Sequence, residues 1–195
     1  MNIFKAIKRE RKQVKRFYVV MISIAVSLVI FLFLKGLTTP FYLCYLIFIE
    51  FLIFISIINK INYHKLTYIC NNNRLMYKSG LFSNESLIFC DKVVLVHTEK
   101  MEDEIEIVVV TNVNLRNKSL KHIGKSFLKR YPLLTEDYLK VKKLYPDTIF
   151  YYNVIKKGGL KKYILLDEIY KNCVKAVYTE ECIENIKISR GQTLV

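Results

Sequence analysis

The residues best suited to nucleophilic chemistry are Cys90, Asp91 and His97. A catalytic cysteine needs its histidine within hydrogen-bond reach. Six residues separate Cys90 from His97, which is about 20 Å along an extended strand. We therefore predict no catalytic residues here and no enzyme activity.

Metal and cofactor chemistry has equally little support. His64 and His122 have no cysteine or carboxylate cluster at zinc-ligand spacing. The acidic residues near position 100 lack the alternating ligands and the glycine of a calcium loop, so we predict a solvated hairpin tip. These residues are Glu99, Glu102, Asp103, Glu104 and Glu106. Residues 157–160 lack P-loop spacing. We expect no metal and no cofactor.

Five cysteines show no C-x-x-C motif and no repeated spacing: Cys44, Cys70, Cys90, Cys173 and Cys182. In a cytoplasmic domain such thiols stay reduced. We predict that the four outside the apolar segments are small buried hydrophobic residues.

Two lysine clusters are the stronger candidates for binding. The first falls at helical spacing over residues 118–130, which predicts a basic amphipathic helix. The second surrounds a Gly-Gly pair that predicts a two-residue hairpin turn. We expect them to bind anionic lipid headgroups or a protein partner, or to be a solvated face. Nucleic acid is not expected, because no groove-reading motif is present. The members are Lys118, Lys121, Lys125, Lys129, Lys156, Lys157, Lys161 and Lys162.

These clusters belong to a chain that is dominated by two apolar runs. Residues 17–34 carry no charge, and residues 41–58 carry only Glu50. Each run is close to the ~20 residues that cross a bilayer core. Gly36 and Pro40 lie in the break at 35–40, where one helix ends and the next begins. We predict two transmembrane helices joined by an external turn.

Charge predicts the sidedness of this hairpin. The net charge is +14, and residues 1–16 hold seven basic residues against one acidic residue. Basic flanks stay cytoplasmic. We therefore predict a multi-pass cell-membrane protein with both termini in the cytoplasm. Residues 1–16 are a basic N-terminus, which is either a short interfacial helix on anionic lipid or only a topology signal.

Glu50 lies near the middle of the second apolar run, where a carboxyl group is costly unless it has a partner. Ser23 and Ser27 are at similar depth on the first run. We expect a hydrogen bond to one of these serines, a contact between subunits of a homo-oligomer, or ion movement.

The rest of the chain predicts a cytoplasmic α+β domain over 62–188 with a tail at 189–195. Alternating and β-branched runs predict antiparallel strands. Two helices are expected between 118 and 146, followed by a strand pair at 148–155 and 160–166. An apolar stripe over 165–178 predicts a C-terminal amphipathic helix.

About seven strands followed by an amphipathic helix resembles the order of pleckstrin-homology-like (PH-like) domains. Two spans before such a domain are similar to the bacterial PH-like membrane proteins. Residues 73–82 (NRLMYKSGLF) are similar to that family's strand–glycine–turn opening. The helical insertion at 111–146 departs from the family pattern. The resemblance implies a PH-like sheet and no general catalytic activity.

Together these patterns predict a membrane-anchored, non-catalytic adaptor or assembly module that docks on a protein partner or on anionic lipid. The alternatives are a membrane-embedded oligomer subunit that uses Glu50 in helix contacts, and a membrane-bound enzyme of unrecognised type.

Overall fold

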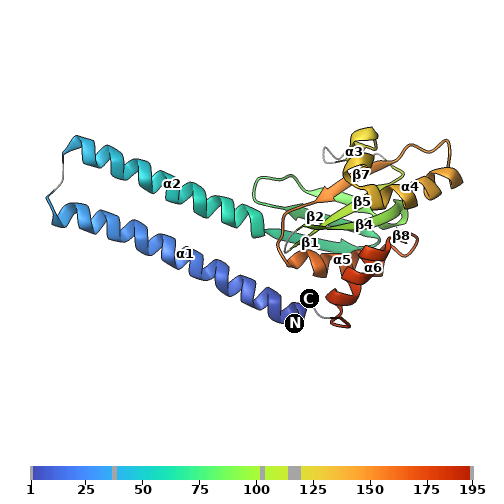
Figure 1. Cartoon of the computed structure of the whole chain (residues 1–195), viewed down its shortest axis with the longest axis horizontal. Coiled ribbons are helices and arrows are strands. Elements are labelled where there is room, and N and C mark those ends of the chain that lie inside the picture. Colours follow the sequence, from blue (N-terminus) through green and yellow to red (C-terminus); the bar gives the residue numbers. More distant parts are fainter. Residues whose placement is uncertain (1, 37–38, 102–103, 114–119, 194–195) are drawn as a thin grey trace.

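The computed structural model describes residues 2–36, 39–101, 104–113 and 120–193. A long helical hairpin projects from an α+β domain, and the N-terminus lies beside that domain (Figure 1). The hairpin consists of α1 (Ile3–Leu34) and α2 (Pro40–His64). The domain contains β1 (Leu66–Asn71), β2 (Arg74–Ser79), β3 (Ser86–Phe89), η1 (Cys90–Lys92), β4 (Val93–Met101), β5 (Glu104–Thr111), β6 (Lys121–His122), α3 (Lys125–Arg130), α4 (Pro132–Leu144), β7 (Tyr151–Ile155), α5 (Lys161–Asn172), β8 (Val177–Tyr178) and α6 (Glu180–Ser189).

The hairpin agrees with its prediction from the apolar runs. Both helices are long and apolar enough to cross a membrane, judged by length and composition. No residue of α2 is buried within the protein. Pro40 begins α2, because a proline at the first helical position needs no hydrogen bond for its nitrogen. These features suggest association with a membrane.

One interpretation of the sequence predicted a separate interfacial helix at the basic N-terminus. The structure does not contain that separate helix. The basic N-terminus is the first part of α1, and Ile3, Ala6 and Ile7 are buried in the core of the domain. The three residues follow the i, i+3, i+4 spacing of one helix face. Since this apolar stripe fits the domain, α1 is anchored there before it reaches its apolar run.

The domain holds two sheets, where the sequence suggested one PH-like sheet of about seven strands. The first has the order β1-β2-β3, and the second has the order β6-β7-β5-β4-β8. Neighbouring strands are antiparallel except β4 and β8. The short η1 turn follows β3 directly and leads into β4, so the chain leaves the first sheet there and starts the second.

The second sheet separates two hydrophobic cores. Ile105, Ile107 and Val109 of β5 lie in a core with residues of α1, α5 and α6, whereas Val108 and Val110 lie in a core with residues of α3 and α4. Successive residues of a strand point to opposite faces. Because β5 is covered on both sides, it is almost fully buried.

Several predicted elements have different bounds or types. Residues 160–166 are not a strand, since α5 begins at Lys161. The helix predicted from the apolar stripe at 165–178 is α5, which ends at Asn172. Val177–Tyr178 forms β8, and α6 follows it as a further helix. The predicted helix at 118–130 is shorter, because Lys121–His122 is a strand and α3 begins at Lys125. Part of that prediction, including Lys118, lies outside the described residues, as do Glu102 and Asp103 of the acidic tip.

The Gly-Gly pair is not a hairpin turn but the site where the domain meets the helical hairpin. Gly158 and Gly159 both have positive φ, at 129° and 56°. The amide of Gly158 donates to the Tyr63 carbonyl at 2.8 Å. A Cβ on Gly159 would lie 2.2 Å from Oε1 of Glu10. Glycine is required here because the backbone passes directly against both long helices.

Candidate functional site

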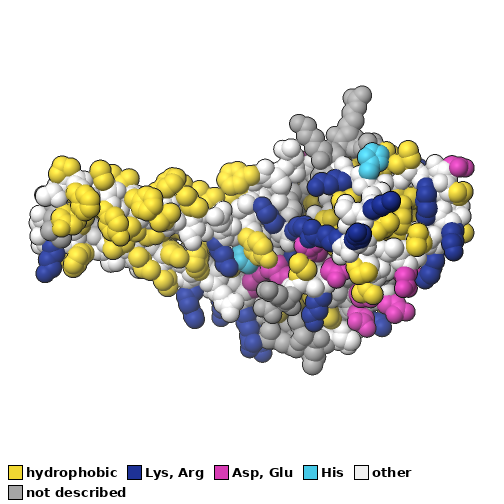
Figure 2. Space-filling model, turned by 45° about the horizontal axis from the view of Figure 1, so that its top comes forward, with side chains coloured by type: hydrophobic (Ala, Val, Ile, Leu, Met, Phe, Trp, Pro, Cys, Tyr) yellow, Lys and Arg dark blue, Asp and Glu magenta, His cyan; other side chains and the backbone are white. Residues whose placement is uncertain are grey.

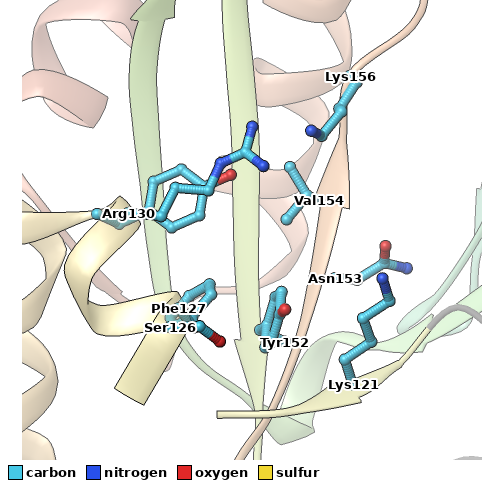
Figure 3. A pocket seen from close by; sticks show the side chains of 9 residues that line it. Lys121, Ser126, Phe127, Arg130, Tyr152, Asn153, Val154 and Lys156 are labelled. Carbon is cyan, nitrogen blue, oxygen red and sulfur yellow. The ribbon is translucent and has the colours of Figure 1, made fainter. Parts of the chain in front are cut away.

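A basic pocket of about 480 Å³ lies between β6, β7 and α3 (Figure 3). The basic side chains in the close-up come from β6 (Lys121), from α3 (Arg130) and from the segment directly after β7 (Lys156). The lining residues are Lys121, Ser126, Phe127, Arg130, Tyr131, Tyr152, Asn153, Val154 and Lys156.

Strand register and aromatic packing fix the walls of this pocket. Lys121 of β6 pairs with Tyr152 of β7. Phe127 of α3 packs on Tyr152 with ring centroids 3.9 Å apart, and on Tyr131 at 5.1 Å. Such tilted aromatic pairs add stabilisation beyond their buried area. The floor of the pocket is therefore aromatic and held by tertiary contacts.

Glu106 of β5 provides the negative charge of the site. Its side chain is 9% exposed, and its carboxylate lies 3.5 Å from Arg130 Nη2 and 3.6 Å from Lys156 Nζ. The Tyr131 hydroxyl donates to Glu106 Oε2 at 3.0 Å. Burial and this carboxylate raise the pKa of Tyr131, so the phenol remains a neutral donor.

The charges do not balance within the pocket. Arg130 and Lys156 share the single carboxylate of Glu106, and Lys121 has no carboxylate within ion-pair distance among the described residues. The half-exposed Arg130 and Lys156 remain reachable from solvent. The site is thus an aromatic-floored recess with excess positive charge, which suits an anionic group.

Lys162 does not belong to the exposed basic patch in which the sequence analysis placed it. The residue is 1% exposed. Its Nζ lies 2.7 Å from Glu104 Oε2 and donates to the Lys156 carbonyl at 2.7 Å. Burial with a partner avoids the cost of an isolated charge. Lys162 therefore fixes the backbone at Lys156 and cannot meet a ligand on the surface.

The other predicted lysines divide among three places. Lys121 and Lys156, one from each predicted cluster, meet in the pocket. Lys125 and Lys129 are exposed on α3 and do not line it. Lys157 accepts a hydrogen bond from Ser79 through its carbonyl, and Lys161 lies at the base of the helical hairpin.

Arg130 and Glu106 were absent from the predicted binding residues. The sequence placed Glu106 in a solvated acidic tip, but the residue is buried. The alternation of acidic and apolar residues at 104–107 was the available signal, because it places both glutamates on one face of a strand. Nothing in the sequence indicated that α3 would cover that face.

The thiols and His97 have separate surroundings. The ring of His97 is fully buried, 3.0 Å from Thr179 Oγ1 and 3.1 Å from Glu99 Oε2. The Cys90 thiol instead contacts those of Cys70 and Cys173, a cluster that the sequence spacing did not reveal. The described residues hold no group of three side chains arranged to bind a metal ion.

Glu50 lacks the partner expected for its Oε1 atom. The Ser27 hydroxyl donates to the Ile24 carbonyl on its own helix at 2.8 Å, and Ser23 is exposed on α1. Oε1 of Glu50 is buried and has no hydrogen-bond partner within the described part of the chain.

Comparison of the chain with protein-family models, with curated proteins and with solved structures finds no match.

Proposed function

We propose that this protein is a membrane-anchored, non-catalytic adaptor, whose α+β domain receives an acidic group of a protein partner in the basic pocket. The observation that carries the proposal is the excess positive charge of Lys121, Arg130 and Lys156 around one buried carboxylate. Arginine and lysine form strong charge-assisted hydrogen bonds to carboxylates and phosphates. The aromatic floor adds apolar area for the rest of a peptide side chain.

The helical hairpin is the proposed anchor. With α1 and α2 across the cell membrane, the N-terminus and the domain lie on the same side. The basic residues before the first apolar run favour the cytoplasm as that side. The connection is stiff, because only Lys65 separates α2 from β1. A stiff mount holds the pocket at a constant orientation to the bilayer.

The position of the pocket favours a protein partner over the bilayer itself. Figure 2 shows dark-blue side chains around a hollow on the domain, apart from the yellow apolar end of the hairpin. Electrostatic attraction to lipid falls off within about 8–10 Å. A partner that approaches along the membrane can reach the hollow from the side.

The first prediction concerns charge in the pocket. Full-length protein in detergent should bind a fluorescein-labelled hexaglutamate peptide, and added salt should weaken the complex. Changing Lys121→Gln together with Arg130→Gln should weaken it at least tenfold, since two half-exposed charge-assisted contacts of about 1 kcal/mol each together exceed the ~1.4 kcal/mol of a tenfold change. Fluorescence anisotropy measures the affinity.

The matched control is Lys125→Gln with Lys129→Gln, which removes the same charge from exposed positions outside the pocket. It should change affinity less than twofold. Equal weakening by both pairs would show diffuse attraction and contradict the pocket. A third outcome would favour lipid as the ligand of the pocket. The natural protein would then bind anionic vesicles more tightly than the peptide, and only the Lys121→Gln/Arg130→Gln variant would lose the vesicle binding.

A second candidate function is that of a membrane-embedded oligomer subunit, which rests on the buried Oε1 of Glu50 without a partner. Glu50 as a whole is half-buried, so its carboxyl group could turn outward and form a hydrogen bond with a neighbouring copy in the bilayer. Glu50→Leu should then lower the yield of cross-linked dimer in native membranes several-fold, as measured by gel electrophoresis. Ser23→Ala is the control, and an unchanged yield for Glu50→Leu argues against this role.

We also propose that the protein is related to the bacterial PH-like membrane proteins. An apolar helical hairpin before a sheet-containing domain supports it. The division into a three-stranded and a five-stranded sheet does not.

A further inference from the structure

A second cavity, of about 240 Å³, lies where the helical hairpin meets the domain. Its walls come from α1, from the end of α2 and from the segment that begins α5. Three cations line it: Arg11, Lys15 and Lys161. Glu10, Val14, His64 and Gly158 complete the lining.

The acidic residue in this cavity is already engaged. The Glu10 carboxylate accepts from the Leu160 amide at 3.3 and 3.2 Å and lies 3.2 Å from Nδ1 of His64. Arg11, Lys15 and Lys161 have no carboxylate within ion-pair distance among the described residues. The cavity therefore has room for a negatively charged group that the protein does not itself supply.

The sequence sets the depth of this cavity relative to a bilayer. Lys15 lies two residues before the apolar run that begins at Phe17, and His64 lies six residues after the second run ends at Ile58. At 1.5 Å per helical residue, these positions are about 3 and 9 Å from the apolar boundary. A headgroup layer extends about 5–8 Å beyond the hydrocarbon core on each side. With the hairpin inserted, the Lys15 end of the cavity would lie within that layer, and the Arg11 and His64 end would lie at its outer edge.

We propose that this cavity, here named the junction site, binds the phosphate of an anionic phospholipid. Arg11, Lys15 and Lys161 supply donors to the phosphate oxygens, and Val14 and Gly158 border the glycerol. Because the three cations come from the membrane helix and from α5, one bound headgroup would join the hairpin to the domain. The inference rests on the proposed insertion of the hairpin, but it is independent of the ligand of the basic pocket.

Full-length protein in nanodiscs tests the proposal. The discs contain phosphatidylcholine alone or with phosphatidylglycerol, and native mass spectrometry counts the phosphatidylglycerol retained after release into mild detergent. The variant Arg11→Gln/Lys15→Gln/Lys161→Gln should retain at least tenfold less than the natural protein. The matched variant Lys8→Gln/Lys12→Gln/Lys65→Gln removes three exposed charges near the same base, outside the cavity, and should retain more than half.

Four results would overturn the junction site, the last of them an unchanged lipid retention in the single variant Lys161→Gln. Equal losses in the two triple variants indicate diffuse attraction. If the protein retains as much phosphatidylcholine as phosphatidylglycerol, the cavity does not select a negatively charged lipid. Displacement of the lipid by millimolar inorganic phosphate assigns the cavity to a free anion. The single variant Lys161→Gln, far from the span in sequence, must also lose lipid. Failure to enter nanodiscs at all would instead contradict the membrane anchor.

Discussion

Gly159→Ala should lower the free energy of unfolding of the domain by about 3 kcal/mol, and its melting temperature by about 10 °C. Gly159 has a φ of 56°, which costs an L-residue about 1–2 kcal/mol. The new methyl group would also meet Oε1 of Glu10 at 2.2 Å and Nδ1 of His64 at 2.9 Å. Moving Glu10 aside breaks its bonds to the Leu160 amide, at about 1.5–3 kcal/mol for a charged acceptor.

The buried thiols of the domain provide the measurement. Cys90, Cys173 and Cys182 are buried, so a fluorogenic maleimide labels them only as the domain unfolds in detergent. Gly191→Ala is the matched control, because Gly191 also has a positive φ of 72° but its added methyl would meet nothing closer than 3.5 Å. Its cost should be only the backbone strain of about 1 kcal/mol.

A double-mutant cycle separates the clash from the strain. In a Glu10→Ala background, Gly159→Ala should cost clearly less than in the natural protein but still more than Gly191→Ala, because the blocking carboxylate is gone while Nδ1 of His64 remains 2.9 Å from the new methyl group. A cost of Gly159→Ala that equals the control in the natural background would mean that α1 does not rest against this turn. The hairpin would then be held to the domain by the apolar contacts of α1 and by the Lys65 link instead.

The helical hairpin was predictable because apolar length and charge flanks are local properties. The strands at 66–111 were predictable for the same reason, since alternation and turn residues are local. The pocket was not, because it joins Lys121, Arg130 and Lys156 through the register of β6 on β7 and the packing of α3. No pattern in one segment reports such contacts.

The structure departs most from the sequence prediction at residues 156–166. A Gly-Gly pair with lysines on both sides matches a hairpin turn. In the structure, the positive φ of Gly158 and Gly159 serves a close passage against α2 and α1 instead. The apolar Leu165, Leu166 and Ile169 then face the core from a helix. The Gly-Gly pair indicates positive φ angles, but the sequence pattern does not indicate which part of the protein lies against this segment.

Lys162→Met should destabilise the domain by about 3 kcal/mol, because it leaves Glu104 without the partner of a buried ion pair. Methionine keeps the length of the side chain, so lost packing contributes little. The matched control is Lys171→Met on the same helix, α5. Lys171 forms an equally short ion pair, at 2.7 Å to Asp167, but its side chain is 51% exposed. A solvated pair contributes at most about 1 kcal/mol.

A compensating change distinguishes structure from binding at Lys162. Adding Glu104→Gln to Lys162→Met removes the uncompensated charge and should recover at least half of the lost stability. This double variant should bind hexaglutamate within about fivefold of the natural protein, because it loses the bond that fixes the Lys156 backbone but removes no charge that lines the pocket. If the double variant is stable but binds hexaglutamate tenfold more weakly, Lys162 takes part in ligand binding. Equal destabilisation by Lys162→Met and Lys171→Met would contradict its burial.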